Sequence, residues 1–280
     1  SLRQQTLTSL ETILVDNGST DRSVELVRQC FPEVRVIPLE RNIGFSAANN
    51  IGIRQARGRY IAPLNNDAVA GPEWLAALVA SLETHPEVGF CASRMVLYDQ
   101  PDLVDTCGDF YTAEGVPGKI GHLEPADLYD VPREVFGACA GAALYRRAML
   151  EQVGGFDEEF FIVHEDSDLS FRARLHGYRC LYIPTAVVYH HLGASLGPQS
   201  DTAAYHAQRN MEFVFFKNMP PGLLLKYLPL HMIPDVFLFV RYLQHRQGQV
   251  YLRAKLDALL MMPKMLKKRR EIQSARRVPE

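Results

Sequence analysis

Acidic side chains follow two apolar segments of the sequence, at the points where buried strands would end. Asp16 follows residues 13–15, and Asp67 follows residues 60–64 after two asparagines. Open α/β proteins bind ligands beyond the carboxyl ends of their parallel strands. Asp16 could there accept hydrogen bonds from a base or ribose, and Asp67 could hold Mg²⁺ or Mn²⁺ if substrate phosphates and water completed the oxygen shell. Ordinary turn or helix-cap chemistry also explains each residue on its own.

A third acidic group lies further along the chain, in the segment HEDSDL. Glu165, Asp166 and Asp168 fall near the start of an expected helix over residues 166–176, where the helix dipole favours acids. The same arrangement places a candidate general base beside a like charge that raises its pKa. The spacing alone does not choose between these two interpretations.

The elements that would position these groups alternate between strands and helices through the first third of the chain. Such alternation is typical of βαβ units and a parallel sheet. The expected strands cover residues 12–15, 34–39, 60–64, 180–183 and 186–189. The expected helices cover residues 45–56, 147–153 and 166–176, with one more after Thr20 as its cap and one with Pro72 in its first turn. Residues 99–135 are rich in Asp, Gly and Pro, and we expect them to form a flap of strands and loops.

Charge is divided unevenly along the 280 residues. The formal net charge is −2, so we expect no nucleic-acid partner. Residues 1–221 carry a net charge of −10 and residues 222–280 carry +8, which predicts a main domain over 1–221 and a basic helical region over 222–280. An acidic body suits a site for a cationic metal, whereas a basic, apolar tail suits the anionic inner face of a membrane.

The C-terminal region and the cysteines indicate where the protein works. Residues 223–243 are strongly apolar but include Lys226, Arg241 and two prolines, so we expect an interfacial helix rather than a transmembrane one. A basic cluster at residues 264–270 follows. The five cysteines form no CxxC pair, which is typical of buried thiols in a reducing compartment. We therefore expect a cytoplasmic protein, peripheral at the inner face of the cell membrane.

A set of motifs, in a fixed order, is more specific than any of these features alone. The set VDNGSTD, RNIGFSAANN, LNNDAV, GAALYRRAMLEQVGGFDEEFF, HEDSDLSFRARLHGY and VVYHHLGAS resembles the family 2 glycosyltransferases of GT-A fold, especially the rhamnosyltransferase-like bacterial branch. The resemblance covers roughly residues 10–220. It implies a Rossmann-like nucleotide-diphospho-sugar transferase fold with a mixed, mostly parallel central sheet and a helical C-terminal appendage. The family opens with a buried strand that has no counterpart here, so the first strand is expected to be missing.

The resemblance also implies a role for individual residues. Asp166 would be the catalytic base, and a divalent metal, Mg²⁺ or Mn²⁺, would be bound by Asp67 with His190 or His191. Neighbours on a strand point to opposite faces, so at most one of these histidines is expected in the site. Arg209 and Asn210 would belong to an element that closes over the donor. The implied substrate-binding residues are Asp16, Asn42, Gly44, Asn49, Asn66, Glu165, Arg209 and Asn210.

Together these residues imply an inverting hexosyltransferase. Its partners would be a dTDP- or UDP-sugar donor, carrying rhamnose or a similar sugar, and a glycan or lipid-linked acceptor in cell-surface polysaccharide synthesis. The alternative is a degenerate GT-A protein that acts as a membrane-associated binding module without catalysis. A nucleotidyltransferase would share the sheet and the metal-binding acid, but it would carry a Gly-rich phosphate loop that this sequence does not display.

Overall fold

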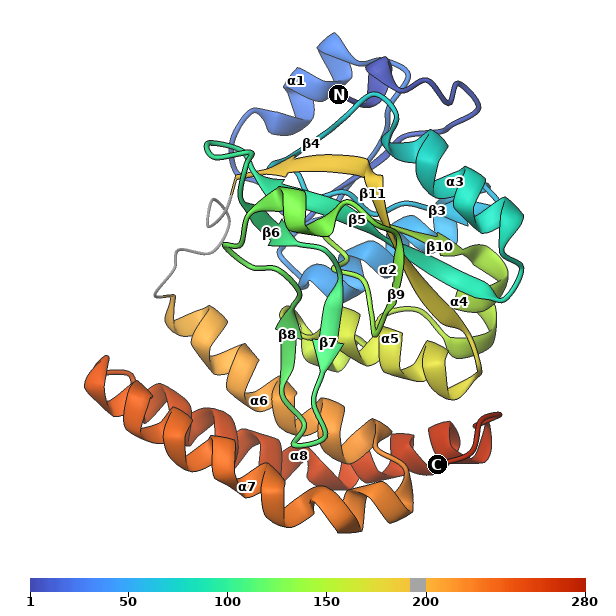
Figure 1. Cartoon of the computed structure of the whole chain (residues 1–280). Coiled ribbons are helices and arrows are strands. Elements are labelled where there is room, and N and C mark those ends of the chain that lie inside the picture. Colours follow the sequence, from blue (N-terminus) through green and yellow to red (C-terminus); the bar gives the residue numbers. More distant parts are fainter. Residues whose placement is uncertain (192–199) are drawn as a thin grey trace.

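The computed structural model describes residues 1–191 and 200–280. A mixed sheet lies between helices, and three long C-terminal helices form a further layer beside it (Figure 1). The strands are β1 (Ile13–Asp16), β2 (Arg35–Pro38), β3 (Tyr60–Ile61), β4 (Ala68–Ala70), β5 (Val88–Leu97), β6 (Val104–Thr106), β7 (Asp109–Tyr111), β8 (Pro117–Lys119), β9 (Arg133–Val135), β10 (Ala143–Arg146) and β11 (Arg179–His190). The helices are α1 (Ser23–Cys30), α2 (Phe45–Gln55), α3 (Trp74–Thr84), α4 (Arg147–Val153), α5 (Glu165–Leu175), α6 (Asp201–Asn218), α7 (Pro221–Gln244) and α8 (Gly248–Ser274), with short 3₁₀ turns at Leu2–Gln4, Ala126–Tyr129 and Glu158–Phe160.

The larger sheet has the strand order β3-β10-β5-β11-β4, with β6 beside β5 and β9 beside β11. It is mixed, as expected, but the expectation that it is mostly parallel is wrong for the described residues. Within this sheet only β5 and β11 pair in parallel. β10 lies antiparallel between β3 and β5, and β6 follows β5 through a short turn, which requires an antiparallel neighbour. β1 and β2 form a separate parallel pair.

The central strand β5 carries the core of the domain on both of its faces. Phe90 and Ala92 pack with α4 and α5 residues on one face, whereas Cys91 and Met95 pack with α3 on the other. Alternate residues of a strand point to opposite faces, so one ten-residue strand serves two cores. The helix expected to have Pro72 in its first turn is α3, which begins at Trp74, so Pro72 precedes the helix. Its buried residues are Trp74, Leu75, Leu78 and Leu82.

Most of the expected elements are present, and two are corrected. The segments at 180–183 and 186–189 form one strand, β11, with an irregular register between Ile183 and Val187, where Pro184 has no amide to donate. Thr20 does not cap α1, which begins at Ser23. The Asp21 carboxylate instead accepts a hydrogen bond from the Ser23 amide at 2.9 Å, so Asp21 shapes the turn that leads into the helix.

The C-terminal helices pack on the domain through α6 and α8. α8 runs along α6, and Met265 of α8 joins Phe171 and Leu175 of α5 in one apolar cluster. The predicted boundary between residues 221 and 222 falls after the first residue of α7, and it stays a prediction. Helix α7 is long and apolar enough to cross a membrane by length and composition.

Candidate active site

Asp67 and His190 meet at one edge of the larger sheet. Antiparallel pairing of β4 with β11 aligns Ala68 with His190, which brings Asp67 beside the end of β11. His190 Nε2 lies 3.3 Å from Asp67 Oδ1, and the other ring nitrogen, Nδ1, lies 2.9 Å from Asp105 Oδ2. His191 points elsewhere and stacks on Tyr98. Of the two histidines predicted as ligands, His190 therefore has its imidazole beside Asp67, the acid predicted to bind the metal.

Asp105 of β6 links this pair to a lysine that the sequence did not single out. The carboxylate is fully buried, and its Oδ1 lies 2.6 Å from Lys119 Nζ. Burial alone would raise the pKa of Asp105, but the His190 hydrogen bond and the Lys119 charge lower it to about 2. In turn, the hydrogen bond that His190 donates to Asp105 raises the pKa of His190. The contacting side chains thus alternate between acidic and basic groups, in the order Asp67, His190, Asp105 and Lys119.

A second acidic group lies at the start of α5. Glu165 and Asp166 open the helix, and Asp109 of β7 is close enough for the Asp166 charge to raise its pKa. Burial is the largest cause in all three carboxyls, and it raises the pKa of each. Lys119 counteracts this effect on Asp109 and Asp166. The acid cluster, defined as Asp109, Glu165 and Asp166, is therefore an environment that favours the protonated form of its carboxyl groups more than water does.

Hydrogen bonding distinguishes Asp166 from the other two carboxyls of the acid cluster. Its Oδ1 accepts from the Ser167 amide at 2.7 Å, and its Oδ2 accepts from the Ala140 amide at 3.4 Å. Within the described residues, Asp109 Oδ2 and Glu165 Oε2 are buried without a hydrogen-bond partner. Amide donors favour the ionised form of a carboxyl, whereas dry burial favours the neutral form. Asp166, which is also only half-buried, is thus the member suited to carry the negative charge.

The segment before α5 has a strained backbone and is held in place by α6. Phe161, Val163 and His164 adopt positive φ angles of 64°, 70° and 68°. The buried Asn210 amide donates to the carbonyls of Phe160, Ile162 and Val163 at 2.7–2.9 Å. Non-glycine residues in this region cost free energy, and they persist where surrounding contacts fix them. Asn210 therefore positions the segment that presents the acid cluster.

Arg209 acts on the same segment. Its guanidinium donates to the carbonyls of Glu159 and Phe160 at 2.7 and 3.1 Å, and its side chain is buried. In the structure, the polar groups of Arg209 and Asn210 thus serve the main chain of residues 159–163. Direct contact of either residue with a donor stays a prediction.

The residues expected to bind the nucleotide gather around the end of β1. Asp16 accepts a hydrogen bond from the Ser19 amide at 3.2 Å, within the turn that follows β1. Asn17 donates to Asn42 Oδ1 at 3.0 Å, and Asn42 Oδ1 also accepts from the Gly44 amide at 2.9 Å. The turns after β1 and β2 are therefore joined side chain to side chain.

Gly44 connects this group with the segment before α5. Its φ angle is 89°, and a Cβ there would lie 2.5 Å from the Phe161 ring. The Ser46 amide donates to the Phe161 carbonyl at 3.2 Å. The other two residues predicted to bind substrate do not join this group of hydrogen bonds. Asn49 donates to the Phe45 carbonyl of its own helix, and Asn66 is exposed. The last residues of the motif VVYHHLGAS, 192–195, lie outside the described residues.

The residues present fit a metal site that the substrate completes. Asp67 supplies a carboxylate, and His190 supplies an imidazole whose Nδ1 is oriented by the buried Asp105, as in carboxylate–histidine–metal arrangements. Across residues 1–191 and 200–280, no three His, Cys, Asp or Glu side chains are grouped as a complete ligand set. Phosphate and water oxygens would have to supply the rest of the coordination shell.

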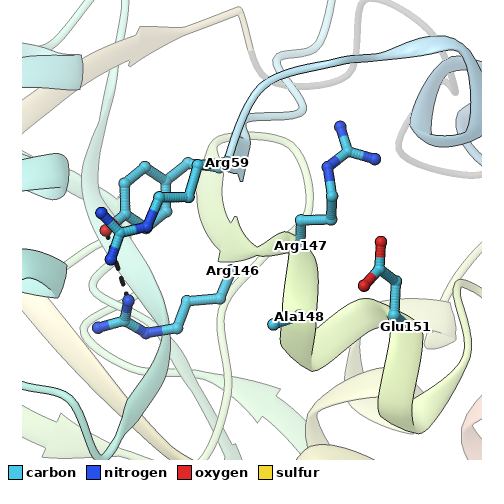
Figure 2. A pocket seen from close by; sticks show the side chains of 6 residues that line it. Arg59, Arg146, Arg147, Ala148 and Glu151 are labelled. Carbon is cyan, nitrogen blue, oxygen red and sulfur yellow. Dashed lines mark hydrogen bonds between the residues drawn. The ribbon is translucent and has the colours of Figure 1, made fainter.

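A cavity of about 270 Å³ lies at the other end of the sheet, away from these groups. It is lined by Arg59, Tyr60, Arg146, Arg147, Ala148 and Glu151, and Figure 2 shows Arg147 pointing away from Arg59 and Arg146. Arg146 donates to the Val88 carbonyl and Arg147 donates to the Gly58 carbonyl, both at 2.7 Å. These arginines tie loops to the sheet, and none of the predicted site residues lines the cavity.

Comparison with known proteins shows what the chain is similar to. The model of a family described as "Glycosyl transferase family 2" matches residues 1–154. An N-acetylglucosaminyl-diphospho-decaprenol L-rhamnosyltransferase of Mycobacterium tuberculosis is 29% identical over 74% of this chain and 75% of its own length. The uncharacterized protein y4gI of Sinorhizobium fredii is 32% identical over 75% of this chain, which spans only 24% of that relative. The solved mannosyltransferase PcManGT of Pyrobaculum calidifontis, in complex with GDP-Man and Mn²⁺, has a TM-score of 0.56 at 18% identity, over 98% of this chain and 79% of its own.

Proposed function

The chain belongs to glycosyl transferase family 2, and from this premise we propose that it is an inverting glycosyltransferase of cell-surface polysaccharide synthesis. Its fold is the GT-A fold of nucleotide-sugar transferases, as the motifs predicted. The donor we propose is a dTDP- or UDP-sugar that carries rhamnose or a similar sugar. The acceptor we propose is a glycan or a lipid-linked sugar, in line with the rhamnosyltransferase relative of M. tuberculosis.

One observation carries the proposal most directly. A carboxylate–imidazole pair, Asp67 and His190, and a half-buried acid, Asp166, both lie at the end of the sheet formed by the carboxyl ends of β3 and β11 and the amino end of β10. Lys119 and Asp105 lie between the two groups in the network of charges. Glycosyl transfer from a nucleotide requires both functions, because the diphosphate must leave and the acceptor hydroxyl must lose a proton.

Asp67 and His190 would hold the metal, which when bound would neutralise charge that develops on the leaving nucleoside diphosphate. Asp105 keeps the His190 ring oriented through its Nδ1. Asp166 would take the proton from the acceptor hydroxyl as that oxygen attacks the anomeric carbon opposite the leaving group. The C1–O bond to the diphosphate breaks as the new glycosidic bond forms, and the configuration inverts.

A donor panel tests this proposal. The purified chain is incubated with UDP-, dTDP- and GDP-sugars, Mn²⁺ and a synthetic lipid-diphosphate acceptor, and nucleoside diphosphate release and product anomer are measured. We expect one nucleotide to support turnover with an inverted product. Release of pyrophosphate would instead indicate nucleotidyl transfer. Binding to vesicles without turnover of any donor would favour the degenerate binding module.

We also propose that α7 and α8 hold the protein against an anionic membrane surface. Large apolar side chains on both helices are exposed: Leu225 75%, Val236 65%, Phe237 72%, Leu259 67% and Leu260 68%. Residues 222–280 carry a net charge of +8, which complements anionic headgroups. Because α7 is bound to its neighbours through a buried charged cluster, we propose an interfacial rather than a spanning position.

Vesicle sedimentation tests the membrane proposal. We expect the variant Leu225→Ser/Phe237→Ser to bind phosphatidylglycerol-containing vesicles at least about tenfold more weakly than the native chain, because two exposed apolar anchors are lost. Leu128→Ser/Val131→Ser removes side chains of similar exposure, 66% and 73%, from the flap and is expected to leave binding unchanged. Equal binding by the two double variants would contradict a membrane role for α7.

A further inference from the structure

The β7–β8 hairpin extends from the sheet to the C-terminal helices (Figure 1). Its first residue, Asp109, belongs to the acid cluster. At its base, Asp109 of β7 pairs with Lys119 of β8, and both side chains belong to the charge network of the candidate active site. At its tip, the Thr112 amide donates to the Val116 carbonyl at 3.1 Å and closes the turn. The hairpin therefore connects its tip to Asp109 and Lys119, which lie near the candidate base Asp166.

The tip is bound by a histidine of α7. Among the residues of α7, all of which the structure describes, His231 alone is classed as buried, with 1% of its surface exposed. Its Nδ1 lies 2.6 Å from the Glu114 carbonyl oxygen at the hairpin tip, and its Nε2 lies 3.1 Å from Glu212 Oε2 of α6. An apolar helix that buries a histidine rather than a leucine uses that position for hydrogen bonding.

Both partners of the His231 ring are acceptors, which fixes its charge. A carbonyl oxygen cannot donate, and Glu212 is held ionised because His231 and Lys255 outweigh its burial and lower its pKa. Both ring nitrogens must therefore carry protons, so the ring is an imidazolium. The charge of Asp235 of α7, which pairs with Lys255 of α8 at 2.6 Å, also raises the pKa of His231. Tyr111 of β7, whose pKa is raised by burial and by the Glu212 charge, is neutral.

The hairpin tip also packs closely against side chains of α6 and α7. Gly115 has a φ angle of 87°, and a Cβ there would lie 2.5 Å from the Phe215 ring and 2.7 Å from His231 Nδ1. The His231 ring stacks on Phe215, with centroids 3.9 Å apart and planes 2° apart. The tip thus sits in a socket formed by α6 and α7 that leaves no room for a larger residue.

We propose that the His231 imidazolium is a positioning residue for sugar transfer, which clamps the hairpin tip to α6 and α7 and so holds Asp109 and Lys119 beside Asp166. The clamp itself is a property of the fold, and only its effect on turnover rests on the proposed function. It also gives α7, the helix proposed to meet the membrane, a direct mechanical connection to the candidate active site.

Two near-isosteric variants separate the two hydrogen bonds of the ring. His231→Asn places an amide donor near the position of Nδ1 and keeps the bond to the Glu114 carbonyl, whereas His231→Gln places it near Nε2 and keeps the bond to Glu212. Each loses one bond, so their thermal stabilities are expected to be similar. We expect His231→Gln to raise the hydrogen-exchange rates of the backbone amides in residues 112–119 at least about tenfold and to lower kcat. We expect His231→Asn to have exchange rates and a kcat close to those of the native chain.

The pH dependence gives a second readout of the same clamp. Burial would lower the pKa of His231, but Glu212 outweighs burial and raises it. Both bonds of the ring are therefore made below that pKa. As pH rises through it, the ring keeps a single N–H, which the Glu212 carboxylate retains as the stronger acceptor, so the bond to the Glu114 carbonyl is lost. Protection of the 112–119 amides is expected to fall with rising pH in the native chain but not in His231→Asn, whose amide does not titrate.

Substitutions at two glycines provide a control that does not alter the buried charges. Gly115→Ala leaves the charges intact and is expected to reproduce His231→Gln, while Gly121→Ala, at a similar φ angle of 78° beside Tyr129, is expected not to. Equal exchange rates and equal kcat in His231→Gln and His231→Asn would overturn the proposal. If the native chain turns over no donor, the proposed function fails, whereas the hydrogen-exchange contrast still decides whether the clamp exists.

Discussion

Replacement of Asp166 by Asn is expected to lower kcat by about 10²- to 10⁴-fold, because an amide cannot take the proton of the acceptor hydroxyl. Asn has the size of Asp, and its oxygen can still accept from one of the two amides, Ser167 or Ala140, that now bond the carboxylate. Nucleotide affinity and thermal stability are therefore expected to stay near native values. Initial rates at saturating donor and acceptor, beside a melting curve, provide the measurement.

Asp109→Asn is the matched control for this experiment. Burial and the Asp166 charge raise the pKa of Asp109, which favours the neutral acid in the native chain. Exchanging a neutral acid for an amide is expected to keep kcat within the same order of magnitude. An Asp166→Asn variant that transfers sugar at the native rate would remove Asp166 as the base, and a large loss only in Asp109→Asn would move that role to Asp109.

The largest effect on stability is expected at Lys217 of α6. Its ammonium is 1% exposed and lies 2.5 Å from Asp157 Oδ2 and 2.7 Å from Asp168 Oδ1. Lys217→Met leaves two buried carboxylates without this partner, and loss of one member of a buried ion pair costs about 3–5 kcal/mol. Urea denaturation of the native chain and the variant measures the difference in the free energy of unfolding.

The pH dependence identifies the source of that stability. Burial would raise the pKa of Asp157, but Lys217 and Lys268 hold it well below the usual range. This contribution is present above the ordinary aspartate pKa of about 4 and is lost as pH falls through the lowered pKa. The stability difference between the native chain and Lys217→Met is therefore expected to shrink as the pH is lowered below about 4.

Lys264→Met is the control for Lys217→Met. Lys264 pairs with Glu159 on the surface, and its side chain is 54% exposed. Exposed pairs contribute about 0–1 kcal/mol, so this variant is expected to stay near native stability. A change below about 1 kcal/mol in Lys217→Met would mean that the buried network is redundant, with Arg172 and Asn218 sufficient for Asp168.

Local sequence patterns predicted the elements that are amphipathic and bounded by clear signals. α4 matches its predicted bounds, and α2, α5 and β1 differ from theirs by a residue. β5 was not predicted, although it is the central strand. It is buried on both faces, so it lacks the alternation of polar and apolar residues that marks a half-exposed strand. Its place in the sheet follows from pairing with β10 and β11, which lies beyond any local window.

The candidate site was predicted in part for a similar reason. Asp16, Asp67 and Asp166 follow or precede recognisable elements, and His190 was one of two equivalent neighbours until strand pairing aimed it at Asp67. Asp105, Asp109 and Lys119 were not predicted, because they lie in the flap, where periodicity is weak. Their only local signal is charge, and charged residues are ordinary in loops. The network arises when β6, β7 and β8 bring that flap to the acid cluster.

Calorimetric titration of UDP, dTDP and GDP into the purified chain, with and without Mn²⁺, tests the central claim most directly. The claim is that Asp67 binds a nucleoside diphosphate through a metal. We predict Mn²⁺-dependent binding of one nucleotide, weakened at least about tenfold in Asp67→Asn and unchanged in Asp127→Asn, a surface acid of the flap. Equal affinity with and without Mn²⁺, or equal affinity in the native chain and Asp67→Asn, would contradict the claim.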